Sequence, residues 1–182
     1  MGQGTKPDKT ADNDTLRKVL KSQYDAAASM LREAVVRCPE QVWTATTHPN
    51  PFWHVAYHGL FYMHLYLQPS EADFEPWEKH REEYQYMGRA PFPPYRSPEI
   101  DQPYSKADVL EYADFCISII DPAVDRLDLD LPECGFSWYK MSKLEHQIVN
   151  LRHIQHHAAQ LIDRLAAAGV TGFDWAGGDR AE

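Results

Sequence analysis

The sequence predicts an all-α protein, a four-helix bundle with a long crossover between its second and third helices. Four segments carry apolar residues at three- and four-residue steps, and none shows the alternation typical of a strand. One link, residues 69–104, is too long to be a hairpin between adjacent antiparallel helices. It would return the chain to the same end of the bundle, so that the second and third helices run parallel.

The N-terminal part of the chain divides into a tail and a first helix. Residues 1–12 are polar and contain glycine, so we expect a disordered tail followed by one domain over residues 13–182. From Asp14 onwards apolar residues recur with a helical period until Pro39 ends the pattern. This helix carries no evident chemistry, and we expect it to supply core.

The second predicted helix combines histidines with a lack of charge. Asn50 would cap it, with Pro51 as its first helical residue, and no charged residue occurs from there to Leu67. The helix must therefore be largely buried. His54 and His58 share one of its faces, and an unpaired buried imidazole costs on the order of a few kcal/mol. Both rings consequently need partners.

The link over residues 69–104 is rich in proline and aromatic residues, which leaves room for only a short helix around residues 75–87. We expect its aromatic side chains to pack on the bundle, with a lid as the alternative role. Ser105 and Asp108 form a capping box for the third helix. At Pro122 this helix either kinks or gives way to a short continuation that Asp121 caps and that ends near Leu127.

The fourth predicted helix carries the most informative pattern. Ser142 caps it, Gly169 ends it, and residues 170–182 are expected to fold back partly onto the bundle. On the helical wheel His156 faces solvent, and an apolar face is buried. One polar stripe along the edge of that face consists of His146, Asn150, His153, His157 and Gln160.

Two histidines of this stripe, His153 and His157, lie one turn apart, so a single divalent ion can bridge them. The second helix faces the fourth and offers His58 as a third ligand, with His54 either replacing or supporting it. Three imidazoles with an open coordination position are typical of a catalytic site, and zinc, nickel and iron(II) all suit them. The alternative is that these histidines only form hydrogen bonds within the core.

Composition limits the partners and the compartment. The formal net charge of −9 and the scattered basic residues argue against nucleic acid and anionic membranes as partners. No apolar run reaches the ~18 residues of a membrane span, and the N-terminus has no apolar signal core. Cys38, Cys116 and Cys134 show no paired spacing, so we expect a reducing cytoplasm. The apolar helix faces also suggest a homodimer.

Two motifs resemble the DinB-like superfamily, which is named after a damage-inducible protein and is unrelated to the translesion polymerase. They are Asn-Pro-Phe-Trp-His-Val-Ala-Tyr-His at 50–58 and Arg-His-Ile-Gln-His-His at 152–157, followed by Gln160 and Leu161. The similarity runs from about Asp14 to Trp175. It implies a four-helix bundle with a long link between helices two and three, and a divalent metal ion held by His58, His153 and His157.

The resemblance also bears on function, because better-understood members look like thiol-dependent transferases or isomerases. We therefore expect a divalent-metal-dependent enzyme, a hydrolase or thiol S-transferase, that acts on a small molecule and possesses an open three-histidine site. Asn150, Gln160 and His54 are candidates to orient ligands or substrate, and no residue qualifies as a catalytic base. The alternatives are a metal- or small-ligand-binding bundle without turnover, and a structural or interaction protein.

Overall fold

The structure is a computed structural model that describes residues 9–93 and 95–178. Within these ranges the chain forms helices and irregular segments and contains no strand, so the all-α prediction is confirmed. No helix in these ranges is long and apolar enough to cross a membrane. The helices are α1 (Lys9–Arg37), α2 (Glu40–Trp43), α3 (Phe52–Tyr66), η1 (Glu71–Asp73), α4 (Lys106–Ser118), α5 (Ile120–Arg126) and α6 (Lys143–Ala167).

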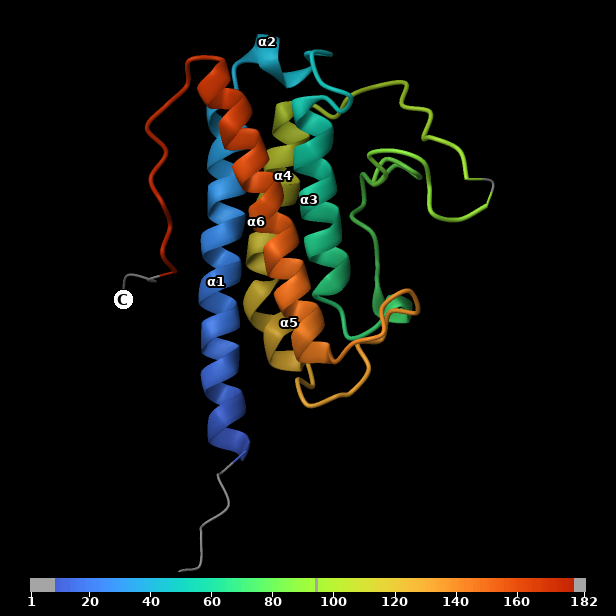
Figure 1. Cartoon of the computed structure of the whole chain (residues 1–182), viewed down its shortest axis with the longest axis vertical. Helices are drawn as coiled ribbons and strands as arrows, with labels where there is room; N and C mark the ends of the chain where they lie inside the picture. The colour runs from blue at the N-terminus through green and yellow to red at the C-terminus, as the bar shows by residue number, and fades with distance from the viewer. Residues whose placement is uncertain (1–8, 94, 179–182) are drawn as a thin grey trace, which may run out of the picture.

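The four longer helices lie side by side (Figure 1). Helices α1 and α3 each pack against both α4 and α6, and the core lies between them. Leu31, Leu60, Ile154 and Leu161 are fully buried there. Each such side chain contributes about 1.5–3 kcal/mol through the removal of its apolar surface from water. This core holds the polar stripe of α6 against α3.

The start of α1 differs from the expected disordered tail. Residues 1–8 lie outside the described part of the chain, and α1 already begins at Lys9, within the range expected for the tail. Each residue added to an existing helix forms one more backbone hydrogen bond without a new nucleation step. The polar residues before Asp14 can therefore extend a helix that the apolar face behind them stabilises.

The capping predictions for α4 and α6 are confirmed, because Ser105 Oγ accepts from the backbone N–H of Asp108 and Ser142 Oγ from that of Glu145. The prediction for α3 was wrong. Its N-cap residue is Pro51, which makes no side-chain cap, and the Asn50 carbonyl accepts from the Arg164 guanidinium at 2.9 Å. The start of α3 is thereby tied to the end of α6.

At the end of α4 the chain breaks and continues as α5, as the second alternative predicted. The N-cap of α5 is Ile119 and not Asp121, and the helix ends at Arg126. Pro122 lies in the first turn of α5, where its missing N–H costs no intrahelical hydrogen bond.

The link between α3 and α4 contains η1 and turns, and the helix expected around residues 75–87 does not form. Glu83 adopts a left-handed backbone conformation with φ of 68°, which interrupts any helix there. Trp77, Tyr84 and Tyr104 are buried, and the Trp77 ring stacks on Tyr112 of α4 at 4.7 Å. Packing of these aromatic rings thus takes the place of the helix.

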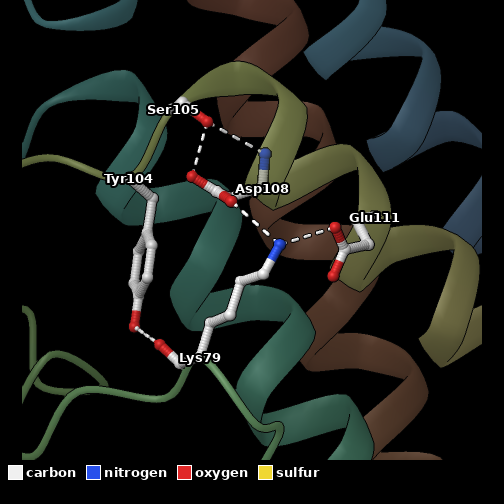
Figure 2. Close-up of polar contacts among 5 residues, drawn as sticks. All are labelled: Lys79, Tyr104, Ser105, Asp108 and Glu111. Atoms are coloured by element: carbon white, nitrogen blue, oxygen red, sulfur yellow. Dashed lines mark hydrogen bonds and ion pairs between the residues drawn. The ribbon is translucent and has the colours of Figure 1, made fainter.

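Lys79 in the link and Tyr104 at its end are tied to each other and to the first turns of α4 (Figure 2). The Tyr104 hydroxyl donates to the Lys79 carbonyl at 2.7 Å, and the Lys79 ammonium reaches Asp108 at 3.2 Å and Glu111 at 2.6 Å. Ser105 and Asp108 complete the group through the helix cap. These contacts fix where the intervening residues cross α3.

A second tie joins the beginning of the link to the beginning of α6. The buried Lys143 ammonium donates to the carbonyl oxygens of Pro69 and Cys134. Gly135 makes this approach possible, since its φ is 86° and a Cβ at this position would lie 2.5 Å from the Pro69 carbonyl oxygen.

The segment after α6 folds back along α1, as predicted (Figure 1). Gly169 ends α6 in the left-handed conformation, with φ of 84°. The Arg37 guanidinium donates to the Thr171 and Gly172 carbonyls and lies 3.9 Å from the centre of the Phe173 ring.

Candidate metal centre

Three histidine rings from two helices meet near the middle of the molecule. His58 comes from α3, and His153 and His157 come from successive turns of α6. The Nε2 atom of His153 lies 3.1 Å from Nε2 of both other rings. The three ligand atoms all lie within 4.8 Å of one another, which is close enough to hold one metal ion. We call these three residues the histidine cluster.

The two helices approach closely beside the cluster because residue 59 is a glycine. A Cβ on Gly59 would lie 3.1 Å from Cδ1 of Leu31 and 3.4 Å from Cβ of His157. The first distance is tighter than an ordinary carbon contact, and the second is at the lower limit of one. The missing side chain therefore lets the backbone of α3 approach His157 directly next to His58.

Burial keeps the cluster uncharged at neutral pH. Burial, followed by the neighbouring His157, lowers the pKa of His58 to about 3. Burial also lowers the pKa values of His153 and His157 to about 4. Neutral imidazole is the form that binds a metal ion.

Hydrogen bonds at the opposite ring nitrogens orient two of the rings. The Nδ1–H of His58 donates to the Gln85 carbonyl at 2.6 Å, and the Nδ1–H of His157 donates to Oε1 of Gln160 at 3.1 Å. Because both partners accept, the neutral rings carry their protons on Nδ1 and present Nε2 lone pairs to the cluster.

The third ring, His153, faces both of these lone pairs with its own Nε2. A single proton on that atom can be donated along one direction only, so at least one buried lone pair would stay unsatisfied without a cation. The Nδ1 atom of His153 is buried and has no hydrogen-bond partner among the described residues. The arrangement therefore fits a divalent cation better than it fits a network of imidazoles alone.

The structure places the other candidate residues around the cluster in different ways. His54 does not join it, because its Nε2 bonds to the Tyr84 carbonyl at 2.9 Å and its ring stacks on Trp53. Gln160 contacts the cluster through His157. Asn150 donates instead to the Met63 carbonyl, and His156 is exposed as predicted.

Sequence reasoning missed the carbonyl groups of Tyr84 and Gln85, which bind the rings of His54 and His58. Every residue carries a carbonyl, so no residue type marks such a contact. The histidines at 54 and 58 indicated only that some partner was needed.

A pocket of about 790 Å³ opens beside the cluster, and His58 and His153 form part of its wall. Its walls come from α3, the link, the loop before α6, and α6 itself. No Lys or Arg occurs among the described residues that line it, and its one carboxylate is the exposed Glu71. We call this the aromatic pocket; its aromatic lining outside the histidines is Phe61, Tyr62, Tyr66, Phe74, Tyr86, Phe92, Trp138 and Tyr139.

Comparisons of the chain with protein-family models, curated proteins and solved structures found no match.

Proposed function

We propose that the chain is a metal-dependent enzyme of the DinB-like type that acts on a small molecule. Helices α1, α3, α4 and α6 would be its four-helix bundle, and residues 69–104 the crossover that makes α3 and α4 run parallel. The observation that carries the proposal is the convergence of the three Nε2 atoms at the wall of a pocket. His58, His153 and His157 would hold the ion.

The donor set suits zinc, nickel or iron(II), and three protein ligands leave at least one coordination position for substrate. When bound, such an ion supplies Lewis-acid chemistry and lowers the pKa of a thiol or water that reaches it. The Gln85 carbonyl and Gln160 keep the rings of His58 and His157 in place. The aromatic walls line one side of the site.

The reaction we propose is hydrolysis or thiol S-transfer. Both reactions need a nucleophile at neutral pH, and both fit a cluster that adjoins a pocket able to admit a small molecule.

A metal- or ligand-binding module without turnover is the second candidate, and one observation favours it. The described lining of the pocket offers a single carboxylate, Glu71, as a general base, and the Nδ1 atom of His80 is already engaged by the Tyr57 hydroxyl. Turnover of a thiol-conjugation or ester substrate, lost in His153→Ala, would decide for the enzyme.

Metal analysis tests the site itself. We expect the purified wild-type chain to contain one divalent ion and His58→Ala and His157→Ala to contain none. His156→Ala is the matched control, because it removes an exposed imidazole from the same helix. Equal metal content in wild type, His58→Ala and His157→Ala would overturn the ligand assignment.

A further inference from the structure

We propose that the aromatic pocket selects ligands with one anionic metal-binding head on an uncharged aromatic body, and rejects ligands whose body carries further anionic groups. The part of this inference that concerns the metal-binding head rests on the proposed function. The part that concerns the aromatic body rests on the pocket alone.

The walls of the pocket are suited to a flat apolar body. Aromatic rings cover it from three parts of the chain: Phe61 and Tyr62 from α3, Tyr86 and Phe92 from the link, and Trp138 from the loop before α6. Rings of this kind gain stability by edge-to-face or offset contact with another ring.

Several of these rings already hold each other in place. Phe61 meets Phe74 edge-on at 5.3 Å, and Tyr62 meets His153 edge-on at 5.4 Å. The rings of Phe92 and Trp138 meet edge-on at 6.3 Å. A pre-arranged surface loses little conformational entropy when a ligand binds.

The charges around the pocket determine which groups the body of a ligand can carry. A divalent ion on three neutral imidazoles would bring two positive charges to one end of the pocket, and these attract an anionic head. Along the rest of the described lining no Lys or Arg could pair with a second anion, and Glu71 would repel it. Burying an unpaired charge is costly, so phosphates and polycarboxylates are disfavoured there.

The volume also fits this class of ligand. About 790 Å³ lies within the range of small-molecule sites, which is about 300–1,000 Å³. The cluster forms part of the wall, so a head on the ion and a body against the rings can be bound together.

Calorimetry with two thiol probes tests the proposal on the chain of residues 1–182 loaded with zinc. The probes are 2-naphthylmethanethiol, which has an uncharged aromatic body, and mercaptosuccinate, which has two carboxylates beside its thiol. We expect the naphthyl probe to bind at least about tenfold more tightly, the scale set by an unpaired buried anion. Equal or tighter binding of mercaptosuccinate would overturn the inference.

A second test uses a variant that adds a cation to the wall of the pocket and that should still fold. Tyr86 is only half-buried, so Tyr86→Arg should be tolerated and should reduce the preference for the naphthyl probe by about tenfold. Trp175→Arg is the control, because Trp175 is exposed and lies outside the aromatic pocket, and its preference should equal that of wild type. An unchanged preference in Tyr86→Arg would contradict the proposed selection.

Binding experiments on the metal-free chain distinguish a failure of this inference from a failure of the proposed function. If the wild-type protein binds none of zinc, nickel and iron(II), the proposed function fails. The naphthyl probe should still bind the metal-free pocket better than mercaptosuccinate, as quenching of tryptophan fluorescence would show. Failure of that ranking in the metal-free chain refutes the body selection whether or not zinc binds.

Discussion

Helix α6 carries histidines in two environments that differ in the partners of their ring nitrogens. Near its start, His146 is fully buried among the rings of Tyr66, Phe136 and Tyr139, and neither ring nitrogen has a hydrogen-bond partner among the described residues. Two to three turns later, His153 and His157 meet the ring of His58 with their Nε2 atoms. Burial and a shared helical stripe are common to both places. Only the convergence of donor atoms from a second helix distinguishes the candidate site.

The largest expected effect is the stabilisation of the chain by metal. An ion that binds only the folded state stabilises it by about 4 kcal/mol at a thousandfold excess over Kd. Thermal unfolding with and without zinc should show this increase in wild type and in His146→Leu, and no increase in His157→Ala. A zinc response that His146→Leu loses and His157→Ala keeps would reverse the assignment of the two environments.

The second largest expected effect is the loss of stability of the metal-free chain in acid. Burial lowers the pKa of His146 from 6.5 to about 4, so its contribution is fully present above pH 6.5 and is lost as the pH falls towards 4. The unfolded state takes up the proton first, which favours unfolding. Between pH 7 and pH 4, His146→Leu should lose about 3 kcal/mol less stability than wild type. Denaturant unfolding at both pH values measures this, and parallel losses would contradict it.

A smaller effect concerns the partner of His157. Removing the acceptor in Gln160→Leu frees the ring to rotate and should weaken metal binding by about 10- to 100-fold. Gln155→Leu is the control, since the Gln155 amide lies on the same helix and contacts Met30. A competition titration with a chelator gives the affinities, and identical values for the two variants would exclude an orienting role.

The smallest effect is the stability of His146→Leu at neutral pH. The substitution removes two buried ring nitrogens that lack partners and leaves an apolar side chain of similar volume among aromatic rings. We expect a gain of about 1 kcal/mol in the free energy of unfolding. A clear loss of stability would show that the imidazole of His146 has a structural partner.

Much of the fold was predictable from periodicity and local chemistry. The helical segments, the caps at Ser105 and Ser142 and the end at Gly169 follow from rules that act within a few residues. The expectation that the second and fourth helices face each other was also sufficient to place His58 near His153 and His157. The ligand roles of these residues remain predictions that metal analysis must test.

The course of the link could not be derived in the same way. Glu83 takes a left-handed conformation and Trp77 stacks on Tyr112 because of packing between distant segments, which local pattern does not encode. The carbonyls that bind His54 and His58 belong to this same segment. The partners of His54 and His58 were therefore missed because they belong to the link.

The hydrogen atom that serves as the side chain of residue 59 lets α3 approach α1 and α6 closely beside the histidine cluster. Alanine there would favour the helix by about 1 kcal/mol, while its methyl group would lie 3.1 Å from Cδ1 of Leu31 and in ordinary contact with His157. Helix propensity and packing against Leu31 thus oppose each other at this position. If the Leu31 side chain yields by a few tenths of an ångström, the apoprotein becomes harder to melt; if α3 moves instead, the imidazole of residue 58 moves away from those of α6.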